Sequence, residues 1–368
     1  MLTPEIKTAF ESFGVDSEIV SVGQITAGLI NATYLIETEN KEKYILQKIN
    51  TFVFKNPAEL MENIVGVTKY LAENISKNGG DPRRETLNFV KNTNGKYFYL
   101  DAEGGAWRMY IYVDDAFTYN KAESGATLKS AGESFGRFMK LLAGYPAETL
   151  HETIVNFHNT PSRYQDFLKA VEADVKGRKA EVEAEIKFVT DREADTRKLT
   201  DLLAKGEIPL RVTHNDTKLN NVLFDKATNK SICVIDLDTI MPGLAGYDFG
   251  DSIRSGANAA NEDEADLSKV FVNLEFFENY VDGYLSQTAD SLNDAEIENL
   301  AFSAKLMTFE CGMRFLTDYL NGDVYFRTTY PEHNIVRARN QFKLIEDMES
   351  NMDKMQAIVM KYKEKYSK

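Results

Sequence analysis

The chain has 368 residues, 43% hydrophobic and 27% charged, an ordinary composition for a globular protein. Its length favours two lobes or two domains over a single compact core. A formal net charge of -14 and a pI near 5.0 argue against a broad nucleic-acid-binding surface, because such a surface needs clustered Lys and Arg.

The same sequence favours a cytoplasmic protein without a membrane partner. The first residues, MLTPEIKTAFESF, lack the basic and apolar regions of a secretory signal. No apolar run approaches the roughly 20 residues of a membrane helix. Cys233 and Cys311 lie in apolar stretches without metal-ligand spacing, so we expect buried thiols in a reducing compartment. We expect a monomer or weak dimer.

The N-terminal part begins with a helical pattern and continues with strands. Residues 3–13 predict a short amphipathic helix, and residues 25–50 predict a hairpin and a third strand. The first turn contains Gly28, which either belongs to a loop that covers nucleotide phosphates or to an ordinary hairpin turn. Its few glycines leave both interpretations open.

The third strand, YILQK, ends at Lys48. Period-2 alternation places Leu46 and Lys48 on one face of the strand. A charge beside apolar neighbours needs a partner, and either a nucleotide phosphate or a helix Glu would serve. The helical segment at 56–73 offers Glu59 and Glu62, with Glu62 slightly favoured. The alternative is an exposed Lys at a strand end.

Residues 86–113 predict further strands, LNFVKN, YFYLDAEG and WRMYIYV, with turns at Gly95 and at Gly104. The pattern therefore predicts one helix between the third and the fourth strand of the N-terminal part. The last strand would lead into the connection to the next lobe. Backbone groups there, around Tyr112, are candidates to bind an adenine ring.

From residue 126 onward the periodicity is helical. Residues 126–144 predict one helix, and the highly charged residues 161–204 predict helices with solvated faces that form an insertion. Further helices are expected at 267–287, 294–320 and 335–362. One of them carries an apolar stripe that should face a core, made of Leu306, Phe309, Met313, Leu316 and Leu320.

The same helix has a charged face with Glu310, Arg314 and Asp318 at steps of four. This is either a surface charge ladder or an Arg held by two carboxylates, with its guanidinium free to donate to a polyol or acetamide ligand. The segment YLNGDVYF follows and would bring Tyr325 back toward the same ligand.

Two acidic motifs carry the chemistry. HNDTKLNN contains Asp216 and, five residues later, Asn221, and the apolar run ICVI delivers Asp236. The spacing is that of the kinase catalytic loop, in which an Asp orients the attacking hydroxyl and an Asn binds Mg²⁺. We assign Asp216 to the substrate hydroxyl, Asn221 and Asp236 to Mg²⁺, and Lys48 to the nucleotide phosphates.

The neighbours of these motifs have less specific roles. Asp238 is expected to support the metal site or to be a second metal ligand. His214 is expected to brace the loop by hydrogen bonds rather than to transfer protons. Asp248 could contact a ligand or cap the next helix, and Asp251 is expected to pair with Arg254.

Long stretches of the chain carry a family resemblance: GLINATY, YILQKIN, HNDTKLNN, VIDLDTIMPGLAGYDFGDSIR and RFLTDYLNGDVYF. The chain resembles the aminoglycoside phosphotransferase and choline kinase branch of the kinase fold, and is most similar to the N-acetylhexosamine 1-kinases. The resemblance implies an α+β, bilobal, protein kinase-like fold. A small antiparallel-sheet lobe (1–113) would bind the nucleotide, and a larger, mainly helical lobe (114–368) the substrate.

The resemblance also implies an ATP- and Mg²⁺-dependent kinase that phosphorylates the anomeric hydroxyl of N-acetylglucosamine or N-acetylgalactosamine. Asp216 looks like the catalytic Asp, and Arg314, Tyr325 and Asn31 like residues on the sugar side. Gly28, Lys48, Glu62 and Tyr112 would be the nucleotide side. The chain departs from its relatives in having Lys48 where many have Arg, and in a glycine loop with few glycines.

Other acceptors remain open, namely an aminoglycoside, a choline-like amine or homoserine. A non-catalytic pseudokinase is a further alternative, which the presence of Lys48, Asp216, Asn221 and Asp236 disfavours. No single residue distinguishes N-acetylglucosamine from N-acetylgalactosamine.

Overall fold

The structure is a computed structural model that describes residues 2–26 and 30–367. The chain forms two compact units. The first contains the residues up to Phe117 together with Gly144–Val155 and Leu223–Met241, and the second contains the rest. The first unit is therefore larger than the predicted N-terminal lobe, because two later segments join it. One of these segments carries Asp236 and Asp238.

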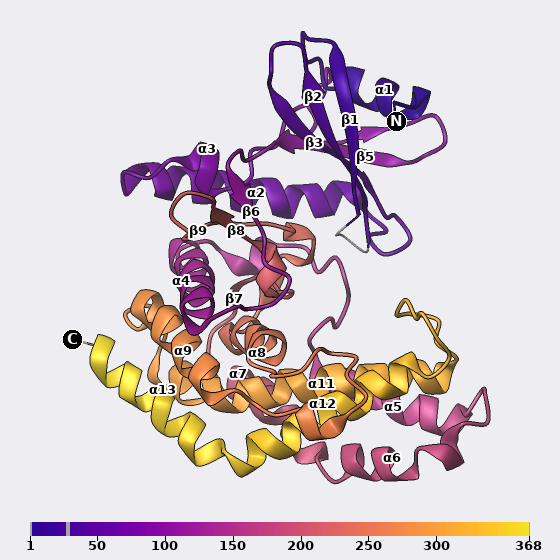
Figure 1. The fold of residues 1–368 in the computed structure, drawn as a ribbon, viewed down its shortest axis with the longest axis vertical. Helices are drawn as coiled ribbons and strands as arrows, with labels where there is room; N and C mark the ends of the chain where they lie inside the picture. The colour runs from indigo at the N-terminus through magenta and orange to yellow at the C-terminus, as the bar shows by residue number, and fades with distance from the viewer. Residues whose placement is uncertain (1, 27–29, 368) are drawn as a thin grey trace. The chain divides into compact units, whose positions relative to one another are not determined.

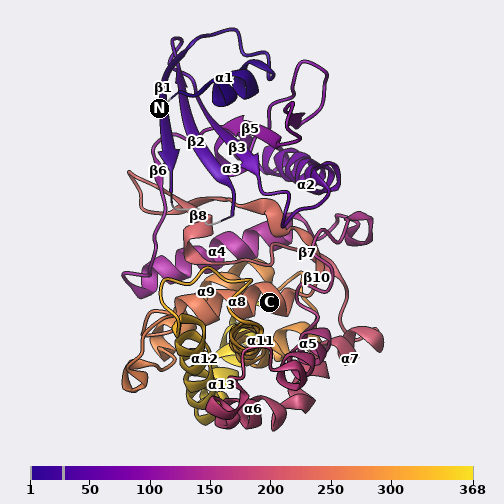
Figure 2. The same cartoon turned by 90° about the vertical axis from the view of Figure 1, so that its right-hand side faces the viewer.

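An antiparallel sheet of five strands, in the order β1-β2-β3-β5-β4, forms the centre of the first unit (Figure 1 and Figure 2). The strands are β1 (Ile19–Ile25), β2 (Ala32–Thr38), β3 (Lys43–Ile49), β4 (Tyr99–Leu100) and β5 (Ala106–Ile111). Helix α2 (Pro57–Lys77) follows β3, which confirms the predicted helix after the third strand.

The predicted strand LNFVKN is wrong. It makes only an isolated bridge between Phe89 and Tyr110. Asn92 explains this, because its side chain accepts hydrogen bonds from the N–H groups of Asn94 and Lys96 and so folds the segment into a turn.

Helix α1 (Pro4–Glu11) covers one face of the sheet. Its N-terminus is capped by the side chain of Thr3, with proline in the first helical position. The helix buries Phe10 in a cluster with Leu46 of β3 and Trp107 of β5. The side chains of β3 that alternate with Leu46 point away from this cluster.

The first unit also contains a second, smaller sheet in the order β6-β8-β9 and a short helix. They are α3 (Pro82–Glu85), β6 (Ala116–Phe117), β8 (Val222–Asp225) and β9 (Ser231–Val234). Arg84 of α3 donates to Asp225 of β8 at 3.1 Å. This bond ties the helix to the strand pair that leads to Asp236.

The second unit is mainly helical. Its helices are α4 (Gly125–Leu141), α5 (Thr160–Ala173), α6 (Glu183–Thr190), α7 (Lys198–Ala204), α8 (Ala245–Gly256), α9 (Leu274–Thr288), α10 (Asp294–Glu298), α11 (Leu300–Asn321), α12 (His333–Ser350) and α13 (Met352–Tyr366). Two short strands, β7 (Arg211–Thr213) and β10 (Met241–Gly243), pair with each other. The predicted helix at 126–144 is confirmed by α4.

Helix α4 packs closely on α9, and a glycine makes this possible. A Cβ atom added to Gly283 of α9 would lie 2.1 Å from the carbonyl oxygen of Lys129 in α4. Only glycine permits this approach of the two backbones.

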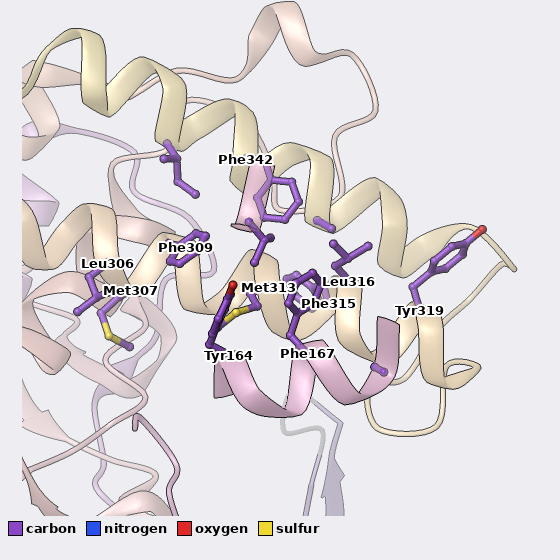
Figure 3. Close-up of a cluster of buried hydrophobic side chains, with 14 of the residues drawn as sticks. Tyr164, Phe167, Leu306, Met307, Phe309, Met313, Phe315, Leu316, Tyr319 and Phe342 are labelled. Carbon is purple, nitrogen blue, oxygen red and sulfur yellow. The ribbon is translucent and has the colours of Figure 1, made fainter. Parts of the chain in front are cut away.

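Helix α11 forms the centre of the larger core (Figure 3). Phe309, Met313 and Leu316 of α11 lie between Phe167 of α5 and Phe342 of α12. All five stripe residues of α11 are at most 1% exposed, which confirms the predicted core face.

The charged segment between α5 and β7 does more than present solvated faces. Val182, Val189 and Leu199 are each at most 2% exposed and belong to the same core as α11. The segment is therefore amphipathic, with its charges outside and its few apolar residues buried. In the described part of the chain, no helix combines the length and apolar character needed to cross a membrane.

Candidate active site

The loop after β7 carries the first motif. Asn215 has a positive φ of 64°, a conformation that Asn adopts more readily than most residues. The backbone N–H groups of His214 and Asn215 donate to the carboxylate of Asp248 at 2.9 and 2.7 Å. Burial raises the pKa of Asp248, which is 2% exposed. Asp248 therefore shapes the loop from inside the protein, and the geometry favours the structural alternative.

Two further contacts brace the same loop. The ring of His214 is fully buried and packs edge-on against Phe135 and Phe138 of α4. Its Nδ1 accepts the backbone N–H of Asp216 at 3.2 Å. The N–H of Thr217, the next residue, donates to Asp251. The backbone is therefore anchored on both sides of the Asp216 side chain.

Asp251 is the second internal carboxylate under the loop. It accepts the backbone N–H of Thr217 at 2.9 Å and pairs with Arg254, whose Nε lies 2.9 Å away. The predicted pairing of Asp251 with Arg254 is confirmed.

The carboxylate of Asp216 is held by two neighbours in the chain. Its Oδ1 lies 2.8 Å from Nζ of Lys218, and its Oδ2 accepts from Nδ2 of Asn221 at 3.2 Å. Burial opposes the ionisation of Asp216, but Lys218, His214 and Arg254 outweigh it and lower the pKa of Asp216. The side chain is 29% exposed, so a ligand can reach an ionised carboxylate.

Asn221 ends the 3-10 turn Leu219–Asn221 and is 6% exposed. Its Nδ2 also donates to the backbone oxygen of Asp216 at 2.8 Å. These bonds fix the amide plane through its nitrogen, and its oxygen is the atom that suits Mg²⁺.

The second motif lies in the first unit, where β9 ends. Asp236 has a φ of 59° and starts the 3-10 turn Leu237–Thr239. A left-handed conformation at a residue other than glycine costs about 1 kcal/mol. The next carboxylate, Asp238, is 4% exposed, pairs with Arg108 of β5 and accepts from Nδ2 of Asn31 at 2.5 Å.

Helix α2 also contacts this motif. Asn63, which is 2% exposed, donates from Nδ2 to the carbonyl oxygen of Ile240 at 3.0 Å and to that of His151 at 2.8 Å. The chain just after the second motif is thereby held by a buried amide.

Lys48 does not form the predicted pair with Glu62, nor one with Glu59. Its Nζ lies 2.5 Å from Glu5 of α1 and 3.7 Å from Asp101. The alternation of β3 turns Lys48 toward the face that α1 covers, and α1 supplies the carboxylate. Glu62 is exposed and its Oε2 lies 2.8 Å from Nε2 of His151 instead.

Three further candidates from the sequence are Gly28 and Tyr112 for the nucleotide side and Asn31 for the substrate side. Gly28 lies outside the described residues. The N–H of Tyr112 donates to the carbonyl oxygen of Lys43 at 3.0 Å, which continues the pairing of β3 with β5. Asn31, a candidate for the substrate side, accepts the N–H of Asn50 at 2.9 Å and donates to Asp238. Asn31 therefore braces the second motif.

Arg314 lies among aromatic rings in the second unit. Its guanidinium carbon is 5.2 Å from the ring centre of Phe157, 5.7 Å from that of Tyr325 and 5.6 Å from that of Phe326. Its NH2 group lies 3.4 Å from the hydroxyl of Tyr325. The predicted neighbours Arg314 and Tyr325 are thus brought together.

Glu310 and Asp318, for which the sequence left open a surface charge ladder or a clamp on Arg314, are buried and bind other groups. Asp318 accepts the backbone N–H groups of Val324, Tyr325 and Phe326, at 2.8 to 2.9 Å, and so shapes the segment that carries Tyr325. Glu310 lies 2.6 Å from both Nδ1 of His158 and the hydroxyl of Thr160. Asp318 therefore binds the backbone that directly follows α11, whereas Glu310 binds residues at least 150 positions away in the chain, which only the packing brings near.

His158 links this cluster to the first motif. Its Nε2 lies 3.0 Å from the carbonyl oxygen of Asn215, the residue before Asp216. Both ring nitrogens of His158 therefore have an oxygen atom within hydrogen-bond distance. Burial opposes the ionisation of Glu310, but His158 and Arg314 outweigh it and keep the pKa of Glu310 low.

Three residues of this arrangement were missed in the sequence. Lys218 could have been found, since it stands two residues after Asp216 in the same loop. Arg108 and His158 could not, because neither stands in a recognisable motif. Their partners, Asp238 and Glu310, are 130 and 152 residues away in the chain.

A metal ion would need oxygen ligands. Among the described residues, no group of three or more His, Cys, Asp or Glu side chains is arranged to hold a metal. Mg²⁺ does not require such a cage, because it keeps several waters and binds one or two carboxylates together with substrate phosphates. The amide of Asn221 and the carboxylate of Asp236 are ligands of the kind that Mg²⁺ prefers.

Comparison with known proteins gives the family. Residues 21–289 match the phosphotransferase enzyme family, APH. The fold is similar to that of the microcompartment-associated aminopropanol kinase, with a TM-score of 0.63, 17% identity and coverage of 95% of this chain and 97% of that one.

Two further solved structures are similar. The amicoumacin kinase hAmiN, in complex with AMP-PNP, Ca²⁺ and Ami, has a TM-score of 0.60 and 15% identity, covering 95% of this chain and 94% of that one. The choline kinase from Cryptosporidium parvum Iowa II has a TM-score of 0.55 and 15% identity, covering 98% and 96%. At these identities the shared feature is the fold, which is the α+β, kinase-like fold predicted from the sequence. The chain belongs to the phosphotransferase enzyme family.

Proposed function

We propose that this phosphotransferase uses ATP and Mg²⁺ to phosphorylate the anomeric hydroxyl of an N-acetylhexosamine. The observation that supports a kinase is the ionised carboxylate of Asp216, held by Lys218 and Asn221 on a braced loop. Asn221 and Asp236, the Mg²⁺ ligands expected from the sequence, are part of the proposal. Bound Mg²⁺ would neutralise phosphate charge.

Asp216 would accept a hydrogen bond from the acceptor hydroxyl and orient its oxygen for attack. Its lowered pKa makes it a weak base, so it would take the proton late, as the bond to phosphorus forms. An anomeric hydroxyl is more acidic than an ordinary alcohol and suits a weak base. The low pKa of Asp216 therefore favours such an acceptor.

The charges around Arg314 support a neutral acceptor over a cationic one. Burial lowers the pKa of Arg163, and the nearby positive charge of Arg314 lowers it further. Arg163 donates to the carbonyl oxygen of Phe157 at 3.0 Å, so the two guanidinium groups share the Phe157 segment. The buried carboxylate Glu310 already has two hydrogen-bond partners, His158 and the hydroxyl of Thr160.

The size of this effect can be judged from Coulomb's law. At about 6 Å and an effective dielectric constant of about 20, each like-charge contact costs about 3 kcal/mol. An amine acceptor next to Arg314 would meet this cost, whereas a sugar would not. The rings of Phe157 and Tyr325 offer flat apolar surfaces for a pyranose, and Arg314 offers donors for hydroxyl or acetamide oxygens.

The test is ATP turnover with Mg²⁺ against N-acetylglucosamine, N-acetylgalactosamine, galactose, choline and kanamycin, with the phosphorylated position read by phosphorus NMR. We expect a sugar 1-phosphate from the N-acetylhexosamines, lost in Asp216→Asn and kept in Asp191→Asn, which changes an exposed carboxylate paired with Lys187. Turnover with choline or kanamycin alone would replace the acceptor by an amine and leave the kinase assignment intact. No turnover of ATP with any acceptor would favour a pseudokinase.

A further inference from the structure

Neighbouring residues of β3 point to opposite faces of the sheet and so have different surroundings. Lys48 and Leu46 share the face that α1 covers, and Gln47 points to the opposite face. On β5, Trp107 stands opposite Lys48 and Arg108 stands opposite Gln47. Residues directly opposite each other in an antiparallel pair share a face, so Arg108 lies on the side of Gln47.

Lys48 is engaged on its own face. Its ammonium group pairs with Glu5 and Asp101 and lies 5.4 Å from the ring centre of Trp107. The hydrogen bond to Glu5 is the main reason why the pKa of Lys48 is raised. Two carboxylates already compensate its charge.

Arg108 is a buried cation with two fixed hydrogen-bond partners. It is 2% exposed, its Nε donates to Oε1 of Gln47 at 2.9 Å, and its NH1 donates to Asp238. The ion pair with Asp238 therefore ties Arg108 to the second motif.

A network of buried groups fixes this guanidinium. Gln47 donates from Nε2 to the hydroxyl of Thr33 at 3.0 Å, and Asp238 accepts from Asn31. The bonds to Gln47 and Asp238 use two of the five N–H groups that a guanidinium carries. In protein kinases, a carboxylate orients the lysine that binds the nucleotide phosphates. Asp238 orients Arg108 in the same way.

We propose that Arg108 of β5, oriented by Asp238 and Gln47, is the cation that binds the nucleotide phosphates in this chain, and that Lys48 of β3 is not. The proposal rests on the proposed function only in that the nucleotide phosphates bind beside Asp236. It explains why β3 carries the neutral Gln47 on the face opposite to α1, since the positive charge on that face comes from Arg108 of the neighbouring strand β5. Arginine also suits the position, because its planar fork can hold Asp238 and a phosphate at once.

The test measures binding of adenosine, AMP, ADP and ATP by calorimetry, with Mg²⁺ and without an acceptor. In Arg108→Gln we expect ATP affinity to fall about 10- to 100-fold, as for loss of a hydrogen bond between charged groups. The loss should shrink from ATP to ADP to AMP and vanish for adenosine. Lys48→Gln should bind all four ligands within about twofold of the wild type, as should the matched control Lys43→Gln, whose Lys pairs with Asp114 at the same strand's exposed start.

Thermal unfolding of the same samples shows whether Arg108→Gln folds. If it does not, Arg108→Lys is the second variant, because it keeps a positive charge in the buried site. It should retain phosphate-dependent binding at reduced affinity, since an ammonium group lacks the fork. Equal losses for all four ligands in the Arg108 variants would reduce Arg108 to a structural brace and overturn the proposal. So would a phosphate-dependent loss in Lys48→Gln.

The outcome for the wild type separates this proposal from the proposed function. A wild-type protein that binds none of the four ligands would overturn the ATP part of the proposed function and this proposal with it. Phosphate-dependent binding that survives in Arg108→Gln would overturn this proposal alone.

Discussion

The substitution Asp248→Asn tests how the catalytic loop is held. In the wild type the two carboxylate oxygens of Asp248 accept the N–H groups of His214 and Asn215, at 2.9 and 2.7 Å, inside the second unit. Asparagine has nearly the same shape but one oxygen instead of two. One backbone N–H would therefore face an NH2 group, and two donors would meet in a buried place.

The expected magnitude follows from these bonds. A hydrogen bond to a charged group contributes about 1.5–3 kcal/mol, and a buried donor left without an acceptor costs about 1–3 kcal/mol. We expect the loop to lose about 3 kcal/mol of local stability. Because about 1.4 kcal/mol corresponds to a factor of ten, the loop should open about 100-fold more often.

Hydrogen exchange of the His214 and Asn215 amides measures this directly, and kcat reports the displacement of the neighbouring Asp216. The control is Asp282→Asn, which changes another buried carboxylate of the same unit, 8% exposed and paired with Lys129 at 2.6 Å. Unchanged exchange at both amides in Asp248→Asn, or the same increase in the control, would refute the reasoning.

Three further predictions concern the same unit. The pKa of Asp216 is lowered, so this carboxylate stays ionised as the pH falls. The acid limb of the kcat/KM profile should therefore lie below about 3.9, the usual pKa of an Asp side chain. In Lys218→Gln a cation that opposes the effect of burial is lost, and the acid limb should move to higher pH. Arg314→Lys should raise KM for the sugar about 10-fold, because the planar fork is lost, with little change in KM for ATP, both read from steady-state rates. Gly283→Ala should destabilise the protein by about 1–3 kcal/mol in urea unfolding, because its Cβ would overlap the carbonyl oxygen of Lys129.

Each of these has its own contrary outcome. A pH profile of Lys218→Gln with the wild-type acid limb would show that Lys218 does not set the ionisation of Asp216. Equal rises of both KM values in Arg314→Lys would point to a general distortion. For the glycine, Gly23→Ala is the comparison, because a Cβ there meets no described atom within 4 Å, and equal destabilisation by both substitutions would contradict the packing argument.

The parts that could be predicted from the sequence are local. Asp216 and Asn221 are five residues apart, and the structure joins their side chains at 3.2 Å. The stripe of α11 was readable because helical periodicity places its residues on one face whatever covers it. The pairing of Asp251 with Arg254 also spans less than one helical turn.

The partners of the charged residues were decided by the tertiary structure. Alternation along β3 correctly grouped Lys48 with Leu46, yet nothing in that pattern says that α1 covers this face and brings Glu5. The same holds for Arg108, which reaches Asp238 from a strand 130 residues away. Periodicity tells which side chains of one element share a face. Which distant segment lies against that face depends on how the whole chain packs, because a buried charge pairs with whichever carboxylate the packing brings within reach.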